Sequence, residues 1–202
     1  MKLYYTPGAC SLAVHIALRE IGATFDGVVV DLSKHTTADG ADFHDISPRG
    51  YVPLLELDDG SRHTEAASLL QYVADLDSAQ AFIGATGSTR RLAVVEWLTF
   101  ISTELHKAFS PWLWHKETAD STRQAVKDKL AARFAELDAL LSKQDYLARE
   151  YSVADAYAFT IVSWANLLAL PLAPYPHLKT YLTRVSARPR VQDALRAEGL
   201  VK

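Results

Sequence analysis

The hydrophobic positions of the first 77 residues change period along the chain. A β-prone run at residues 3–5 stops at a Thr-Pro-Gly breaker at residues 6–8. From Ser11 apolar residues recur every four positions, which predicts an amphipathic helix that ends near Gly22. Three consecutive valines within residues 25–32 predict a buried strand. Because strand, helix and strand follow one another, we expect a βαβ unit with parallel strands.

The next stretch adds a hairpin and a helix. Residues 33–50 are polar and predict only a loop or a short helix. Residues 52–57 form a third expected strand, and a turn at 58–60 leads into a short fourth strand at 62–64. A helix over 65–76 completes the segment. This order predicts an α/β, thioredoxin-like domain with a mixed four-stranded sheet at residues 1–77.

Beyond an expected linker at residues 78–88, the pattern is helical throughout. Apolar residues keep three- and four-residue steps from Leu92 to Phe109 and again from Val126 to Leu141. A capping box at residues 152–155 opens a helix so apolar that it should be central. Prolines then separate two last helices. We therefore predict an all-α domain at residues 89–202.

Charge supports two domains of unlike character. Residues 1–77 carry 5 Lys/Arg and 12 Asp/Glu, whereas residues 78–202 carry 16 and 12, and the whole chain has a net charge of −3. No basic stripe suggests nucleic-acid binding, and no run approaches the roughly 18 apolar residues of a membrane span. With one cysteine and no signal-peptide pattern, a reducing, cytoplasmic location is expected. The seven histidines have no metal-binding spacing, so no metal is expected.

The single cysteine, Cys10, lies where the first strand gives way to the first helix. The first turn of a helix favours a thiolate or a bound anion, although most lone cysteines are simply small buried hydrophobes. A second candidate is the Val52-Pro53 pair at the start of the third strand. A cis bond there would leave the Val52 backbone unpaired and ready to bind an extended peptide. Sequence alone favours the trans form, whereas the thioredoxin-like layout raises the odds of cis.

Two further features allow a structural and a functional interpretation. Thr64 is a fair N-cap for the helix that follows and Glu65 complements its dipole, but the same turn could hold a ligand carboxylate and an ammonium group. Thr99, Thr103 and His106 continue to Ser110 as one polar stripe on the helix that begins near residue 89. Several aromatic residues flank this stripe, so it lines either a cleft, a subunit interface or simply solvent.

Six segments together resemble the bacterial beta-class glutathione S-transferases: MKLYYTPGACSLAVHIALRE, SPRGYVPLLELDDG, TEAASLLQY, EWLTFISTELHKAFSP, SVADAYAFT and RPRVQDALRAEGL. The resemblance extends from Met1 to about Leu200. It implies a thioredoxin-like domain followed by a helical domain, assembled as a homodimer. It also implies glutathione as the co-substrate and no metal.

The resemblance further implies catalytic roles. Cys10 would contact the glutathione sulfur and can form a mixed disulfide with it. Tyr5 and Ser11 match positions beside that sulfur, and His106 matches the far wall of the cleft. A second, apolar substrate would be seated against Phe109, Trp112 and Trp164.

The glutathione contacts implied by the resemblance come from both domains. Val52 would pair its backbone with the cysteinyl part, with Pro53 in cis, and Glu65 would bind the γ-glutamyl ammonium. His35 stands where the family often has a lysine near the glycyl carboxylate. The other matching positions are Tyr51, the Ala66 amide, Lys107 and, from a neighbouring subunit, Thr99, Thr103 and Glu104.

Three positions depart from the family pattern. Tyr51 stands where a glutamine is common, Ala66 where a serine is frequent and Thr99 where an asparagine is usual. The hydroxyl missing at Ala66 is worth on the order of 0.5–1.5 kcal/mol. These departures bear on glutathione affinity more than on the fold.

The function implied is conjugation of glutathione to small electrophilic apolar substrates, a detoxification activity. An alternative is a glutathione-dependent disulfide or mixed-disulfide reductase that uses Cys10. A second alternative, of another class, is a non-catalytic protein that keeps the fold and carries apolar ligands.

Overall fold

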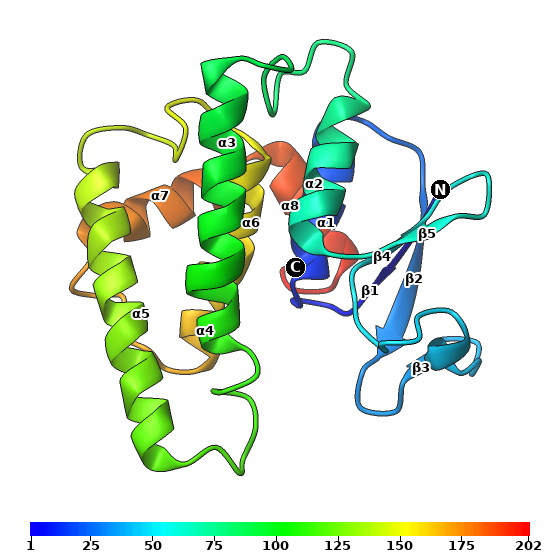
Figure 1. The fold of residues 1–202 in the computed structure, drawn as a ribbon, viewed down its shortest axis with the longest axis horizontal. Coiled ribbons are helices and arrows are strands. Elements are labelled where there is room, and N and C mark those ends of the chain that lie inside the picture. The colour runs from blue at the N-terminus through cyan, green and yellow to red at the C-terminus, as the bar shows by residue number, and fades with distance from the viewer. The chain divides into compact units, whose positions relative to one another are not determined.

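The computed structural model describes residues 1–202, and the chain folds into two compact units. The first unit contains Met1–Ala81 together with Arg188–Lys202, and the second contains Phe82–Ala187. The last segment was predicted within the helical domain. Instead, its helix α8 (Pro189–Ala197) packs against α1 (Ser11–Glu20) of the first unit, as the red and blue helices show (Figure 1). The first unit is therefore discontinuous in sequence.

The first unit is built on a mixed sheet with the strand order β3-β2-β1-β4-β5. Strand β1 (Lys2–Tyr5) runs parallel to β2 (Asp26–Asp31) and antiparallel to β4 (Leu54–Glu56). At the edges lie β5 (Arg62–His63) and β3 (Thr36–Thr37). This confirms the thioredoxin-like layout. The expected four strands are five, because a two-residue strand such as β3 is too short to produce a periodic pattern.

Helices cover one face of this sheet. Helix α1 packs on β1, on α2 (Ala66–Asp75) and on α8, and it buries eight of its ten residues. On the other face Tyr4, Val52 and Leu54 surround Phe43, which comes from the short 3₁₀ helix η1 (Phe43–Asp45). Strand β2 lies near the edge and is not the fully buried run predicted, since its Val29 is 40% exposed.

The second unit is helical. It consists of α3 (Thr89–Phe100), the π-helical turn η2 (Ile101–His106), α4 (Lys107–Phe109), α5 (Asp120–Leu141), α6 (Val153–Leu167) and α7 (Pro176–Ser186). Helix α6 contacts α3, η2 and α7 and buries twelve of its fifteen residues, which confirms the prediction of a central helix. No helix of the chain is long and apolar enough to span a bilayer.

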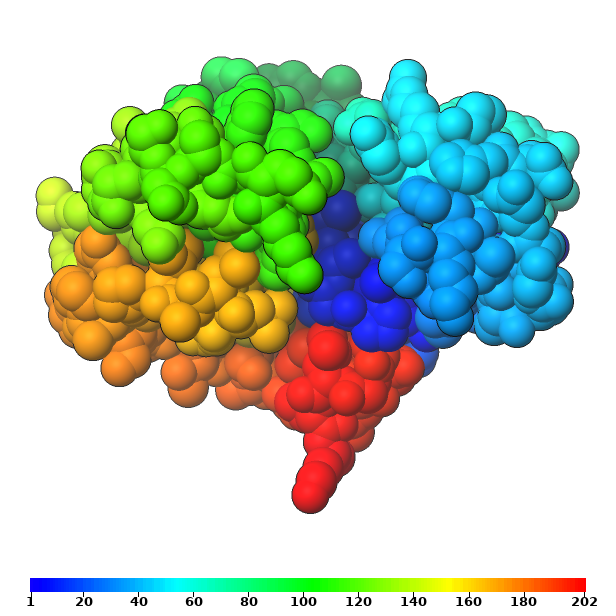
Figure 2. All heavy atoms as spheres, turned by 90° about the horizontal axis from the view of Figure 1, so that it is seen from below, coloured from blue at the N-terminus to red at the C-terminus, as the bar shows by residue number.

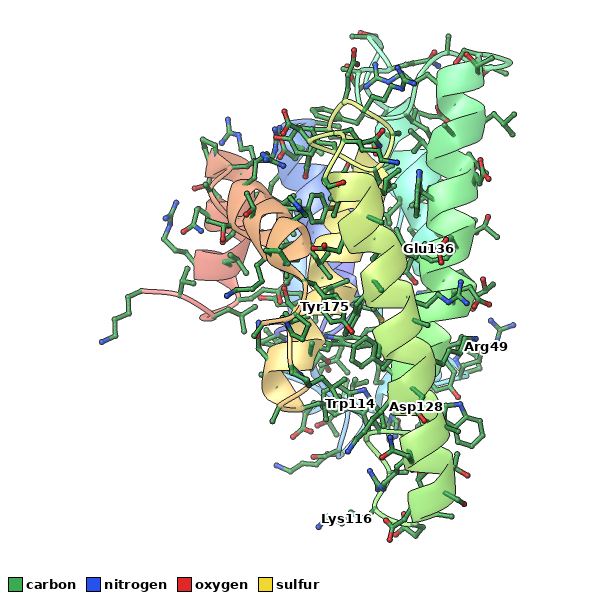
Figure 3. The ribbon with its side chains drawn as sticks, turned by 90° about the vertical axis from the view of Figure 1, so that its left-hand side faces the viewer. Arg49, Trp114, Lys116, Asp128, Glu136 and Tyr175 are labelled. Carbon is green, nitrogen blue, oxygen red and sulfur yellow. The ribbon has the colours of Figure 1, made fainter.

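Side chains fix the ends of α5 and α7 within this unit. Tyr175 is labelled in Figure 3. Its ring packs on Phe134, and its hydroxyl donates to the Ala131 carbonyl at 3.1 Å. Asp138 of α5 accepts hydrogen bonds from the amides of His177 and Leu178 at 2.8 and 2.9 Å. The start of α7 is therefore capped by a neighbouring helix instead of by its own sequence.

The predicted capping box at the start of α6 is confirmed. The Asp155 carboxylate accepts hydrogen bonds from the Ser152 amide at 2.8 Å and the Ser152 hydroxyl at 3.0 Å. It also accepts from the Leu147 amide at 2.9 Å and the Tyr181 hydroxyl at 3.0 Å. Burial raises the pKa of Asp155 to about 6, so the side chain is ionised at pH 7 with four donors around it.

We predict that Asp155→Ala lowers the free energy of unfolding by about 3–5 kcal/mol, since buried donors on the 147–152 segment lose their acceptor. Tyr181→Phe removes one of the four donors and should cost about 1 kcal/mol. Urea unfolding followed by circular dichroism measures both.

Asp120→Ala is the matched control, because Asp120 lies in the first turn of α5 and is exposed. Its effect should stay within about 0.5 kcal/mol. A loss below 1 kcal/mol for Asp155→Ala would contradict the assignment of this carboxylate as the centre of the network.

Candidate active site

Cys10 and Val52 meet at the start of α1. Cys10 is the residue that precedes the first helical turn, and its side chain is partly exposed. Its Sγ donates a hydrogen bond to the Val52 carbonyl at 3.3 Å. Two candidates that lie 42 residues apart in the sequence are thus in direct contact. The sulfur is not sealed in the interior, and it lies where amides of the first turn favour negative charge.

Of the two backbone hydrogen-bonding groups of Val52, one is available to a ligand. The Val52–Pro53 peptide is cis. The β1–β4 ladder ends at Leu54, and the Val52 amide makes no hydrogen bond to any other group of the chain. The expectation that both backbone groups are unpaired is therefore correct for the amide and wrong for the carbonyl, which Cys10 occupies.

Ser11 and Tyr5 are both buried near the start of α1. Ser11 has no exposed surface, and its hydroxyl bonds to the amide and carbonyl of Thr6 at 3.2 and 3.3 Å. Tyr5 is buried with its ring against His15. Burial, together with the negative charge of Glu198, raises the pKa of the Tyr5 phenol. A protonated, buried phenol does not supply an activating anion.

A carboxylate from the C-terminal segment supports the loop that leads to Cys10. Glu198 Oε2 accepts a hydrogen bond from the Gly8 amide at 2.8 Å, and its Oε1 lies 2.8 Å from His15 Nδ1. The Glu198 side chain is fully buried. Arg19 donates to the other ring nitrogen of His15, so the Nδ1 hydrogen points at Glu198. In Figure 2 the C-terminal residues, in red, lie directly against the dark-blue N-terminal ones.

Glu65 lies at the start of α2 in an unusual backbone conformation. It occupies the N-cap position with φ +71°, and its side chain makes no capping hydrogen bond. The prediction of Thr64 as the N-cap is therefore wrong. The Glu65 carboxylate instead lies 3.4 Å from Arg49 Nη1. Ala66, the next residue, is buried, so only its backbone can serve a ligand.

His35 and Tyr51 flank the same loop. The His35 ring packs on the His44 ring with centroids 4.4 Å apart, and His35 Nδ1 is buried without a hydrogen-bond partner. Since a buried nitrogen with no acceptor is better left without its hydrogen, Nε2 is the donor that His35 can offer. Tyr51 is 64% exposed, and only its carbonyl is bonded, by the Ser47 hydroxyl.

The polar stripe of the second unit is interrupted by the π-helical turn η2. Thr99 and Thr103 are exposed and bond only to carbonyls one turn before them. His106, at the end of η2, is mostly buried and faces α6. The wider π turn changes the angle between successive side chains, so the α-helical spacing used in the prediction does not hold here. Lys107 is exposed.

Glu104 already has partners within its own unit. Its carboxylate lies 3.2 Å from Lys129 Nζ and 3.8 Å from Arg133 Nε, both on α5. An expected role toward a neighbouring subunit would have to compete with these two cations.

His106 is held by two aromatic residues of α6. The Tyr157 hydroxyl lies 2.7 Å from His106 Nδ1, and the Trp164 ring packs edge-on with centroids 5.2 Å apart. Burial and the neighbouring Lys107 lower the pKa of His106 to about 4. The imidazole is therefore neutral at pH 7. If Tyr157 donates to Nδ1, the Nε2 hydrogen is left for a ligand.

Of the three residues expected to contact a second substrate, Phe109 and Trp164 are buried and Trp112 is exposed. Phe109 has no exposed surface and packs on Phe134 and Trp164. Trp112 is 46% exposed, and Trp114, not predicted for the site, is 43% exposed and packs edge-on against Trp164. The exposed aromatic surface of this unit thus comes from the segment after α4.

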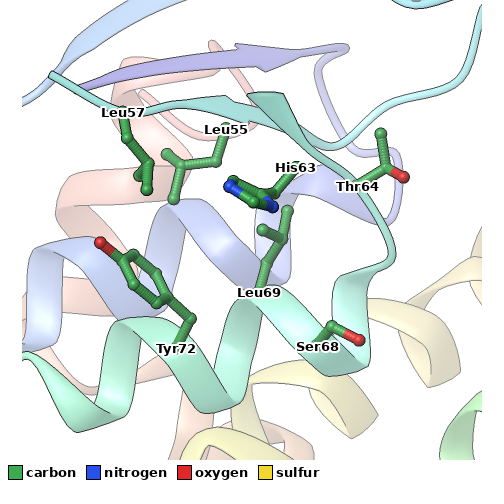
Figure 4. A pocket seen from close by; sticks show the side chains of 7 residues that line it. All are labelled: Leu55, Leu57, His63, Thr64, Ser68, Leu69 and Tyr72. Atoms are coloured by element: carbon green, nitrogen blue, oxygen red, sulfur yellow. The ribbon is translucent and has the colours of Figure 1, made fainter. Parts of the chain in front are cut away.

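A hollow elsewhere in the first unit does not contain this chemistry. It has a volume of about 350 Å³ and lies between the β4–β5 hairpin and α2 (Figure 4). Three leucines line it together with His63, Thr64, Ser68 and Tyr72. Of the residues singled out from the sequence, only Thr64 lines it. No group of three or more His, Cys, Asp or Glu side chains is placed to hold a metal ion.

The comparisons with known proteins identify the class. Residues 8–76 match the model of the glutathione S-transferase N-terminal domain, and residues 100–189 match that of the C-terminal domain. The chain is 40% identical to glutathione S-transferase GstA of Escherichia coli O157:H7. The match covers 99% of this chain and all of GstA. The chain belongs to the glutathione S-transferase family, and it is a glutathione transferase enzyme rather than a non-catalytic carrier.

Solved structures agree with the beta-class resemblance. BphK, a bacterial glutathione S-transferase solved as a ternary complex, is 46% identical with a TM-score of 0.95, covering 98% of this chain and all of that one. A beta-class enzyme of Sphingomonas chungbukensis is 40% identical, and a sphingomonad enzyme complexed with glutathione is 42% identical. Both have a TM-score of 0.94 and cover both chains fully. These relatives support glutathione binding by this chain.

We predict that His106 makes stability depend on pH. An unfolded histidine takes up its proton near pH 6.5, whereas the folded His106 does so near pH 4. Its contribution is thus complete above pH 6.5 and is lost as the pH falls toward 4, by an amount on the order of 3 kcal/mol. Urea unfolding at several pH values, compared between wild type and His106→Gln, measures this difference.

Asp155 acts oppositely in the same range, since its raised pKa favours the folded state as the pH falls from 6 to 4. Because both proteins contain Asp155, its effect cancels in the comparison. Parallel pH curves for wild type and His106→Gln would show that His106 titrates alike in the folded and unfolded chains.

Proposed function

We propose that this transferase conjugates glutathione to small, apolar electrophiles, with Cys10 at the glutathione sulfur. The observation that carries the proposal is the contact between the partly exposed Cys10 sulfur and the Val52 backbone. An extended peptide that binds the unpaired Val52 amide lies beside that sulfur. The Val52 carbonyl can also serve the peptide once the Cys10 thiol gives it up.

The conjugation step depends on a negatively charged glutathione sulfur. The glutathione thiolate is the nucleophile, and the start of α1 favours negative charge at this position. A carbon–sulfur bond forms to the electrophile, the leaving group departs with its electron pair, and the thiol proton passes to solvent. In this proposal Glu65 binds the γ-glutamyl ammonium, the first-turn amides of α2 its carboxylate, and His35 the glycyl end.

From the second unit, the proposal takes His106, Trp112 and Trp164 as contacts of the second substrate. As a neutral imidazole, His106 acts as a hydrogen-bond donor and not as a cation. Lys107 adds an exposed positive charge next to it. Ser11 and Phe109 have no exposed surface, so in this proposal they support the site without contacting the reactants.

Thiol–disulfide exchange is a second activity that the same contact favours. The Cys10 thiolate attacks a glutathionyl mixed disulfide, which forms Cys10–S–S–glutathione and releases the other thiol. A second glutathione then forms oxidised glutathione and returns the Cys10 thiolate. A reducing cytoplasm would supply that glutathione.

We also propose a homodimer. Thr99 and Thr103 are exposed on α3 and η2 with hydrogen bonds only to their own turn, so they remain available to glutathione bound by a neighbouring subunit. Glu104 has less freedom, since Lys129 and Arg133 hold it.

Cys10→Ser separates the two activities. We expect it to abolish reduction of a mixed disulfide, because no sulfur is left to accept the glutathionyl group. Conjugation to an activated aryl halide should persist at a reduced rate, since the nucleophile belongs to glutathione. Spectrophotometric assays of both reactions test this.

Intact mass gives an independent reading. Wild type exposed to oxidised glutathione should gain about 305 Da that dithiothreitol removes, and Cys10→Ser should gain nothing. If wild type takes up no glutathionyl group and Cys10→Ser retains full conjugating activity, the assignment of Cys10 to the glutathione sulfur is wrong.

A further inference from the structure

We propose that Arg49 and Glu65 together recognise the α-amino acid end of glutathione, with Glu65 on the ammonium and Arg49 on the carboxylate. The Glu65 half rests on the proposed function. The Arg49 half is new: it assigns a cationic contact to the γ-glutamyl carboxylate, in addition to the neutral amides of α2.

The two side chains form an ion pair that the fold does not need. Arg49 Nη1 lies 3.4 Å from Glu65 Oε1, and the side chains are 68% and 70% exposed. Ion pairs this exposed contribute little to stability. A ligand can therefore separate them at small cost.

The backbone that carries Arg49 is, in contrast, fixed. Gly50 has φ +64° and its amide donates to the Ser47 carbonyl at 2.7 Å. A Cβ on Gly50 would come within 2.7 Å of His44 Cε1 and 2.8 Å of His35 Nδ1. The loop is thus packed onto two imidazole rings, and only the Arg49 side chain is free to follow a ligand.

Like Arg49, Glu65 has a fixed backbone and a side chain that can turn to a ligand. Its carbonyl accepts hydrogen bonds from the amides of Ser68 and Leu69 at 3.0 and 2.9 Å, which commits the backbone to α2. Its carboxylate makes no capping bond. The amides of Ala66 and Ala67, the first two of α2, donate to no carbonyl of the chain. One carboxylate, one guanidinium and these amides therefore share a single exposed corner.

An α-amino acid end group matches this corner in charge. Its ammonium and carboxylate are attached to one carbon, so an ammonium on Glu65 places the carboxylate within reach of a guanidinium that already lies 3.4 Å from the same Glu65 oxygen. The protein ion pair is exchanged for two pairs with the ligand. The planar guanidinium fork suits a carboxylate especially well.

The test combines a protein variant with a ligand variant. Calorimetry measures the Kd of wild type and Arg49→Gln for glutathione and for 4-aminobutyryl-cysteinylglycine, which lacks the α-carboxylate. We expect Arg49→Gln to weaken glutathione about five- to tenfold and to change the analogue less than twofold. Arg49→Lys should recover part of the loss.

Arg190→Gln is the matched control. Arg190 is an exposed arginine of α8 that pairs with Asp193 at 3.2 Å, and its loss should leave both Kd values unchanged. An equal weakening of both ligands by Arg49→Gln, no effect on either, or tighter glutathione binding would each overturn the proposal. The last result would show that Arg49 only competes for Glu65.

Failure of the underlying function has a different signature. Glutaryl-cysteinylglycine lacks the ammonium and keeps a carboxylate. If wild type binds it as tightly as glutathione, Glu65 does not hold the ammonium, and the proposed function loses that contact whatever Arg49 does.

Discussion

The buried carboxylate of Glu198 is the constraint on which the candidate site depends. It accepts the Gly8 amide on one oxygen and meets the His15 ring with the other. Gly8 precedes Cys10 by two residues and His15 lies in the middle of α1, so one side chain sets both the loop and the helix that position the sulfur. A buried carboxylate is tolerated only when its oxygens are satisfied in this way. Cys10 can then stay partly exposed without losing a fixed position.

In the second unit, helix α6 makes two separate sets of contacts. At the start of α6, Asp155 collects four donors and holds the segment before the helix. Farther along, Tyr157 and Trp164 contact His106. The same burial that raises the pKa of Asp155 lowers that of His106, because each environment disfavours charge. His106 is consequently a neutral group whose orientation is set by α6.

Local patterns in the sequence predicted most of the framework. The strand-to-helix change at Cys10, the central apolar helix and the Ser152–Asp155 capping box are all correct. Each depends on residues that lie close together in the chain. The family resemblance, carried by six segments, is confirmed as well.

What could not be predicted depends on long-range contacts. Glu198 and Gly8 are 190 residues apart, and nothing near Glu198 marks it as part of the site. The π turn at 101–106 altered the phase of the polar stripe, and a strict helical period cannot detect such a turn. Tyr157 lay within an apolar run, and Arg49 in a polar loop. Neither Ser11 nor Phe109 showed from sequence that it would be fully buried.

The discontinuous first unit has a consequence for synthesis of the chain. Its sheet and first two helices emerge from the ribosome early, whereas α8 and Glu198 are made only after the whole second unit. A nascent chain therefore holds Gly8 and His15 without their carboxylate until residue 198 has been made. Only then can the loop before Cys10 and the middle of α1 gain the acceptor that joins them.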